Sequence, residues 1–285
     1  MKFREASNLY LKHQKIRNSK ATYSQAKGYL KRSNMYLGNM NCEDIDSNTM
    51  YDFIEHRRKV NPRVSNTTLN KYIRFISSVL KDELDIILKF KKLRQDRKIP
   101  QVLDEITIHK VFRYLDKFNI PEHQRNKVMF SLLLDTGLRI SELINVKVND
   151  INFQQNMILV KHTKIKSERI VLFTNETKKL LNDYIVMNRI RDYIIINLET
   201  REKLHPDSIQ TICQRIQTRI GTKQSITPHK WRHTFATNFT DNNGNMFVLQ
   251  KLLGHQNIAT TQLYVTVSMK KTINEYFRVV ENSVK

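Results

Sequence analysis

Apolar residues recur at helical spacing along most of this 285-residue chain, and this periodicity limits what the chain can fold into. The pattern is clearest after Thr68, where apolar residues lie three or four positions apart on one helical face: Leu69, Tyr72, Ile73, Ile76, Val79 and Leu80. Ser65 and Asn66 are possible caps at the start of this helix. A mainly α-helical protein is therefore expected.

Residues 1–88 are predicted to form a small domain of four helices. Two earlier helices are expected over Phe3–Lys15 and Thr22–Leu37, and a third follows a Ser47 cap. The domain would end before a basic segment, KFKKLRQDRKIP, which closes with Pro100 and begins a predicted linker over residues 89–102.

This basic segment has two interpretations. It is either a linker lying along DNA phosphates or a solvated helix end. The first interpretation predicts DNA contacts from four basic residues: Lys91, Lys92, Arg94 and Lys98.

A different pattern appears in residues 103–285. Asn156–Val160 and Arg169–Phe173 are rich in β-forming residues and are separated by a charged turn, which predicts a hairpin. A further short strand is expected over Tyr193–Ile196. Helical patterning surrounds these strands, over Thr107–Phe118, over Gln124–Asp135 and again from Thr174. The predicted fold class is mainly α with a small β-sheet: a four-helix N-terminal domain and an α+β domain.

The composition narrows the function. Lys and Arg outnumber Asp and Glu by 49 to 27, which gives a net charge of +22, and +12 of it falls on residues 1–100. Such an excess is typical of nucleic-acid-binding proteins, although charge alone does not separate DNA from RNA or an anionic membrane.

Several other classes are disfavoured. There is no apolar run long enough to span a membrane and no secretory signal, so a cytoplasmic protein is expected. Cys42 and Cys213 are the only cysteines, which argues against a disulfide scaffold or a cysteine-rich zinc site.

Four short stretches contain the candidate site residues. In TGLRISEL, residues 136–143, Gly137 can end a helix and Arg139 precedes a new one, with Ser141 as its expected cap. The turn HTKIKSER, residues 162–169, places Lys164 near its tip. Taken singly, an arginine near a helix start or a lysine on a turn is an ordinary surface residue.

The other two stretches follow later in the chain. In TPHKWRH, residues 227–233, Thr227 and Pro228 begin a helix whose His229 and Arg232 share one face, while Trp231 points elsewhere to pack. In LLGHQNIATTQLYVTV, residues 252–267, Gly254 ends a helix. His255 follows that glycine, and Tyr264 lies on the next predicted helix. Any one of these residues alone has a structural explanation.

Together, the order and internal spacing of these stretches resemble the tyrosine site-specific recombinases, the phage integrase and Xer-type family, over most of residues 103–270. The resemblance implies that Arg139 and Arg232 hold the scissile phosphate and that His229 accepts a proton or contacts the phosphate. It further implies that His255 donates a hydrogen bond to phosphate and that Tyr264 is the nucleophile. Glu142 matches an acidic position that supports the site.

The resemblance constrains the position of the hairpin lysine less than it constrains the other site residues. Lys164 resembles the hairpin lysine that protonates the departing 5′ oxygen, but many relatives flank that lysine with glycines. Thr163 and Ile165 flank it here. Lys161 and Lys166 are close competitors, and a small register shift favours Lys166.

The residue types suit this chemistry. Two guanidiniums stabilise charge that grows on the phosphate, and a phenol with an ordinary pKa of about 10 needs a proton acceptor to attack. Asp135, Glu142 and Asp150 are too scattered for a two-metal site, so neither a metal nor a nucleotide cofactor is expected.

The resemblance also predicts an assembly. Residues 1–88 would be the core-site DNA-binding domain, and the protein would close on double-stranded recombination sites as a C-shaped clamp and act as a tetramer. An apolar stripe in the tail is predicted to dock on a neighbouring protomer rather than on its own domain: Ile273, Phe277, Val280 and Val284. The alternatives are a type IB topoisomerase-like enzyme that relaxes DNA and a non-catalytic DNA-binding protein. Integration, excision and resolution remain open, as does the origin in a mobile element or a host.

Overall fold

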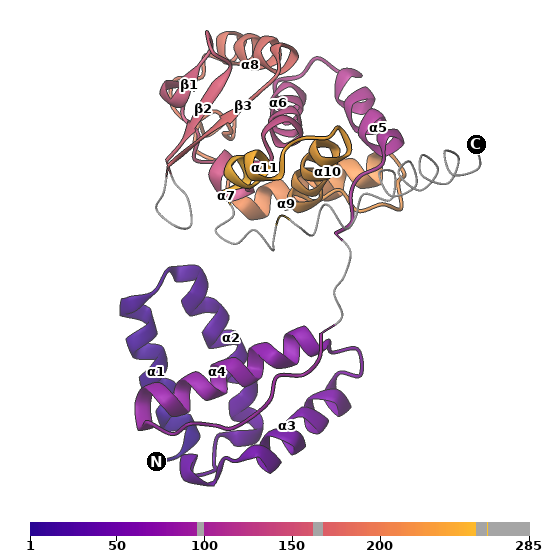
Figure 1. Ribbon diagram of the computed structural model, residues 1–285. Coiled ribbons are helices and arrows are strands. Elements are labelled where there is room, and N and C mark those ends of the chain that lie inside the picture. The colour runs from indigo at the N-terminus through magenta and orange to yellow at the C-terminus, as the bar shows by residue number, and fades with distance from the viewer. Residues whose placement is uncertain (96–99, 162–167, 255–260, 262–285) are drawn as a thin grey trace, which may run out of the picture. The chain divides into compact units, whose positions relative to one another are not determined.

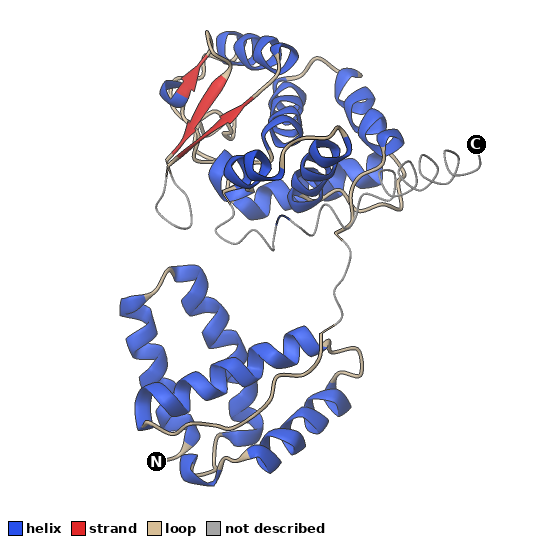
Figure 2. Cartoon of the chain, viewed as in Figure 1, coloured by secondary structure: helices blue, strands red, loops and turns tan. Residues whose placement is uncertain are grey.

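The computed structural model of the chain describes residues 1–95, 100–161, 168–254 and 261. The described part is mainly helical with one small sheet, which confirms the predicted fold class (Figure 2). Backbone contacts divide the chain into two units, Met1–Arg97 and Lys98–Lys285, each with its own apolar core. None of the described helices is long and apolar enough to cross a membrane.

The described residues of the N-terminal unit, 1–95, form four α-helices and a short 3-10 turn: α1 (Phe3–Arg17), α2 (Lys20–Leu37), Cys42–Asp44, α3 (Ser47–Val60) and α4 (Asn66–Leu84). The apolar face predicted for α4 is buried, and the Ser65 side chain caps the helix by accepting from the Thr68 N–H. The expected cap of α3 was wrong by one residue. Asp46 is the N-cap and accepts from the Thr49 N–H at 2.8 Å, since its carboxylate suits the positive end of a helix better than a hydroxyl.

The described part of the basic segment, residues 89–95, is not helical, so it does not continue α4. The helix stops at Leu84 because Asp85 takes a left-handed conformation, with φ 57°. Apolar side chains then alternate inward against the N-terminal core: Ile86, Leu88 and Phe90. The side-chain amide of Asn70 donates to the Leu93 carbonyl and accepts from its N–H, both at 2.9 Å. The first part of the expected linker therefore packs on the N-terminal unit.

The second unit is built around one central helix. Its elements are α5 (Glu105–Asp116), α6 (Pro121–Thr136), α7 (Ile140–Leu143), the 3-10 turn Val148–Asp150, β1 (Ile151–Asn152), β2 (Met157–Val160), β3 (Arg169–Leu172), α8 (Asn175–Met187), α9 (Pro206–Arg219), α10 (Pro228–Asp241) and α11 (Met246–Leu253). Helix α6 packs against both α8 and α10, and β3 contacts α6 and α11 (Figure 1). This arrangement brings the ends of α6, α11 and β3 together.

The predicted hairpin is present, and β1 adds a third antiparallel strand that the sequence did not indicate. In the hairpin, Met157 pairs with Leu172 and Val160 pairs with Arg169. The strand expected over Tyr193–Ile196 was wrong. Its two ends form isolated bridges with two separate partners, Lys147 and Lys203, so no ladder forms.

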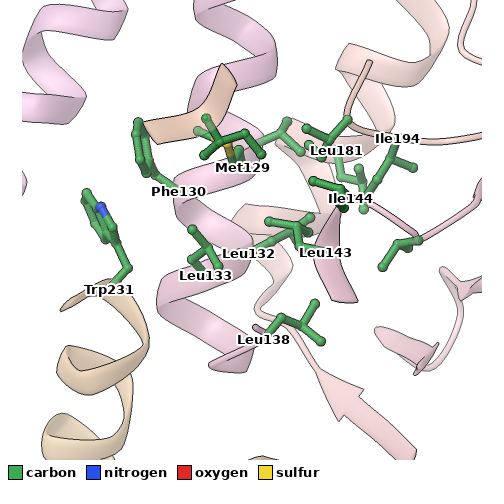
Figure 3. Packing of buried hydrophobic residues seen from close by; sticks show 14 of the residues in the cluster. Met129, Phe130, Leu132, Leu133, Leu138, Leu143, Ile144, Leu181, Ile194 and Trp231 are labelled. Atoms are coloured by element: carbon green, nitrogen blue, oxygen red, sulfur yellow. The ribbon is translucent and has the colours of Figure 1, made fainter. Parts of the chain in front are cut away.

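The core of the second unit fixes the rotation of α10. Trp231 is fully buried and stacks on Phe130 of α6, with ring centroids 4.7 Å apart (Figure 3). Trp231 also forms a T-shaped pair with Phe112 of α5. Because Trp231 faces the core, the side chain of the neighbouring Arg232 leaves α10 in a different direction.

Candidate active site

Arg139 is positioned by a sharp chain reversal after α6. Gly137 takes φ 60° and ends the helix, as predicted. A Cβ added at Gly137 would lie 2.3 Å from Phe235 Cδ1 and 2.9 Å from Leu253 Cδ2, so only glycine allows α10 and α11 to approach so closely. The buried side chain of Leu138 then anchors the turn, and Arg139 becomes the N-cap of α7.

Glu142, rather than the predicted Ser141, caps this short helix. Its Oε2 accepts from the Arg139 backbone N–H at 2.8 Å, and its Oε1 accepts from Arg139 Nη1 at 3.0 Å. A carboxylate three residues into a helix can reach back to the cap in this way, whereas Ser141 is already the second residue of the helix. The Glu142 side chain is only 1% exposed, so its charge depends on these partners.

A third arginine, Arg169 of β3, completes the contacts of Glu142. Its Nη1 and Nη2 donate to the two Glu142 oxygens at 2.8 and 2.7 Å. Burial raises the pKa of the Glu142 carboxyl, but the hydrogen bonds and charge of Arg169, followed by those of Arg139, outweigh burial and hold it below its ordinary value. Sequence reasoning missed Arg169. No local signal marks it, because its partner Glu142 lies 27 residues earlier in the sequence.

The carboxyl end of α11 is the common acceptor of this arginine cluster. Arg169 Nε donates to the Leu252 carbonyl at 2.8 Å. The next carbonyl, of Leu253, accepts from both Arg139 Nη1 at 3.2 Å and Arg232 Nη2 at 2.8 Å. The last carbonyls of a helix lack partners within it and carry partial negative charge, so they suit cations. The structure thus brings Arg139 and Arg232, 93 residues apart in sequence, to one atom.

Helix α10 begins as predicted and carries His229 and Arg232 on successive turns. The Thr227 hydroxyl accepts from the Lys230 N–H, and Pro228 is the first helical residue. His229 is exposed, whereas Arg232 is buried and also donates to the Gly137 carbonyl at 2.6 Å. Burial, with the charges of His229 and Arg232, lowers the pKa of neighbouring His233.

The remaining predicted site residues lie outside the described part of the chain. These are Lys164 and its competitor Lys166, together with His255, Tyr264 and the tail from residue 262. The other competitor, Lys161, is described, and its Nζ forms an ion pair with Asp150 Oδ1 at 2.5 Å. The Lys161 ammonium is thus held at the Asp150 carboxylate.

The predicted DNA contacts of the basic segment are partly described. Lys91, Lys92 and Arg94 are exposed, whereas Lys98 falls among the residues that are not described. Lys92 lines a cavity of about 440 Å³ together with Lys71 and Arg74 of α4. Among the described residues no group of three or more His, Cys, Asp or Glu side chains could hold a metal ion.

Comparison with known proteins identifies relatives of this chain. The model of the phage integrase family matches residues 101–271. A protein of Saccharolobus solfataricus called tyrosine recombinase XerA is 37% identical over 222 residues, which cover 78% of this chain and 70% of that protein. A tyrosine recombinase of Pseudothermotoga lettingae is 31% identical and covers 79% of each chain.

Solved structures show the same fold at lower identity. The Tn1549 transposon integrase in complex with transposon right-end DNA has a TM-score of 0.80 and 16% identity, and it covers 99% of this chain and 100% of that one. XerH site-specific recombinase bound to its difH substrate, in a post-cleavage complex, has a TM-score of 0.74 and 18% identity, covering 90% of this chain and 79% of that one.

Proposed function

This chain belongs to the phage integrase family and is a DNA strand-transferring enzyme of the tyrosine recombinase type. We propose that it recombines specific DNA sites through a 3′-phosphotyrosyl intermediate on Tyr264. The observation that carries this proposal is the convergence of Arg139 and Arg232 on the Leu253 carbonyl, beside the helix that holds His229. No dense carboxylate cluster accompanies these arginines in the described part of the chain.

The two guanidiniums would hold the non-bridging oxygens of the scissile phosphate. Each guanidinium is planar, permanently charged and able to donate two parallel hydrogen bonds, which stabilises the negative charge that accumulates during attack. The Arg139 side chain is partly exposed, so it is the arginine that can meet an incoming phosphate first. His255, which follows Gly254 directly in the sequence, would donate a further hydrogen bond to the phosphate.

The covalent step transfers the phosphoryl group from the 5′ oxygen to the Tyr264 oxygen. The Tyr264 oxygen attacks phosphorus while His229 accepts the phenol proton, and the bond between phosphorus and the 5′ oxygen breaks. Lys164 protonates the departing 5′ oxygen, which leaves as a hydroxyl. The phosphotyrosyl ester keeps the free energy of the broken phosphodiester, so a 5′ hydroxyl from a second DNA strand can reverse the step without ATP.

The partners follow from this chemistry. Exchange between two double-stranded sites requires two protomers on each site, so we infer a tetramer on DNA, with the apolar tail stripe of one protomer docked on its neighbour. The net charge of +22 favours binding to the phosphate backbone of each site. The reaction would integrate or excise a mobile element or resolve joined DNA, in the cytoplasm and without a cofactor.

A nicked suicide substrate tests the proposal. The nick lets a short strand diffuse away after cleavage, so wild-type protein should accumulate a covalent adduct that Tyr264→Phe does not form. Duplex binding should be the same in both proteins. A wild-type protein that binds its site but never forms the adduct would contradict the proposal. A minicircle assay then separates strand exchange, which gives recombinants with defined junctions, from relaxation, which gives only topoisomers.

A further inference from the structure

All three nitrogens of the Arg169 guanidinium donate hydrogen bonds within the candidate active site. The two terminal nitrogens form a bidentate pair with Glu142, and the third nitrogen donates to the Leu252 carbonyl at the end of α11. The side chain is 9% exposed, and its three nitrogens all donate to protein acceptors, which leaves the guanidinium committed to Glu142 and Leu252. Arg169 therefore contacts other parts of the site rather than the reacting atoms.

Glu142 couples the orientation of Arg169 to that of Arg139. Both Glu142 oxygens are shared, because each accepts one hydrogen bond from Arg169 and one from Arg139. The plane of a carboxylate held by a bidentate guanidinium is fixed, and a fixed carboxylate allows the Arg139 guanidinium only one orientation. Without Arg169, Glu142 could rotate and Arg139 could follow it.

The same side chain links β3 to the end of α11. A Cβ on Gly254 would lie 3.2 Å from both Cδ and Nη1 of Arg169, so the guanidinium packs closely against the backbone of this glycine. Arg139 and Arg232 donate to the carbonyl of Leu253, the residue before this glycine. In sequence, Arg169 lies five residues after Lys164, and Gly254 precedes His255 directly.

We propose that Arg169 is a positioning residue for strand cleavage: through Glu142 and the end of α11, it sets the orientation in which Arg139 and Arg232 receive the phosphate. This inference rests on the proposed function. A lysine cannot replace Arg169, because an ammonium group has no planar fork to bind two carboxylate oxygens and a carbonyl together.

The test measures cleavage by folded protein, separately from stability. The variants are Arg169→Lys, Glu142→Gln and, as a matched control, Arg125→Lys. Arg125 is also buried and donates to a backbone carbonyl, that of Ile196, but it contacts none of the cluster. For each protein we would measure duplex affinity, the unfolding temperature and the single-turnover rate constant for adduct formation at saturating DNA. The rates are compared at a temperature where each variant is folded.

Arg169→Lys should form the adduct about 10- to 100-fold more slowly than wild type, because a small misplacement of a catalytic group costs that much. Its DNA affinity should stay within about threefold, since the phosphate contacts that bind the duplex are unchanged. Arg125→Lys should cleave at the wild-type rate. A residue that only stabilised the fold would leave the rate constant of the folded fraction unchanged.

A wild-type rate constant in folded Arg169→Lys would overturn the inference. If Arg169→Lys does not fold, Glu142→Gln decides, because Arg169 is proposed to act through that carboxylate. A slower rate at unchanged affinity in that variant supports the inference, and a wild-type rate contradicts it. Failure of the wild type itself to form an adduct would instead contradict the proposed function.

Discussion

Arg139 and Arg232 donate to the same backbone oxygen, but they differ in their access to solvent. The Arg139 side chain is 29% exposed, whereas Arg232 is buried and bridges the ends of α6 and α11. Arg139 is thus the guanidinium with an open side, and Arg232 holds the two helix ends at a fixed spacing. The proposed phosphate contacts therefore depend on both the charge and the shape of each side chain.

Arg139→Lys should lose most cleavage activity while it keeps DNA binding. Lysine preserves the charge but not the fork that contacts Glu142, Leu253 and Gly254 together, so the rate of adduct formation should fall about 100-fold. Single-turnover assays on the nicked substrate measure this rate, and a gel-shift titration checks binding. A rate within a few-fold of wild type would show that orientation at Arg139 does not matter.

Lys164 and Lys166 can be distinguished by the leaving group. A substrate with sulfur in place of the bridging 5′ oxygen releases a thiol, whose pKa of about 8.5 makes it leave without an acid. Lys164→Ala should cleave the ordinary substrate slowly and the sulfur substrate at the wild-type rate, and Lys166→Ala should resemble wild type on both. The reverse pattern would assign the role to Lys166.

The charge of Glu142 makes a pH-dependent contribution to stability. Burial raises its carboxyl pKa, but Arg169 and Arg139 together lower it below the ordinary 4.5. The folded form therefore binds its proton less readily than the unfolded form, so the stabilisation is complete above pH 4.5 and is lost as pH falls through the folded pKa.

Thermal unfolding from pH 7 down to pH 3.5 measures this contribution. The difference in unfolding temperature between wild type and Glu142→Gln should stay constant near neutral pH and shrink in acid. Glu176→Gln, a change at an exposed glutamate on α8, should show little difference at any pH. A Glu142→Gln difference that grew as pH fell would contradict the assigned sign.

At the scale of elements, sequence reasoning found the parts whose signals are local. The capping residues Thr227 and Pro228, the helix-ending Gly137 and the hairpin strands are all visible in short stretches of sequence. The contact between Arg169 and Glu142 is not, because 27 residues separate them and only the packing of β3 against α6 and α11 brings them together. The docking of residues 86–93 on α4 likewise depends on tertiary contacts with Asn70.

Two glycines with similar φ angles allow the close packing at the site to be tested. Gly137 has φ 60° and Gly221 has φ 63°, but a Cβ would collide with Phe235 at Gly137 and meet nothing within 4 Å at Gly221. Gly221→Ala should cost about 1–2 kcal/mol for the left-handed backbone alone. Gly137→Ala should cost about 1–3 kcal/mol more from overpacking. Denaturant unfolding measures both, and equal costs would contradict the role assigned to helix approach.

At the scale of the whole molecule, two separately cored units carry a large positive charge. The extended segment after α4 belongs to the N-terminal unit as far as Arg94, whose carbonyl accepts from the Asn66 side chain at 2.8 Å. Hydrogen bonds from the Asn66 and Asn70 side chains to its backbone, together with inward apolar side chains, hold this segment in place. The exposed Lys91 and Lys92 are therefore displayed on a fixed surface. A fixed cationic surface suits a polyanion of regular geometry such as duplex DNA.

DNA binding should therefore weaken steeply with salt, and part of that dependence should come from this segment. Each phosphate neutralised by a lysine contributes about 0.9 to the slope of log K against log salt, because it releases a condensed counterion. Replacing Lys91 and Lys92 by glutamine should reduce the slope by up to about 2. The unfolding temperature should not change, since the contacts that hold the segment use the Leu93 backbone. Fluorescence anisotropy between low and moderate salt measures the slope. A wild-type affinity that is nearly independent of salt would contradict phosphate recognition by the protein. Equal slopes in the two proteins would show that Lys91 and Lys92 do not contact DNA phosphates.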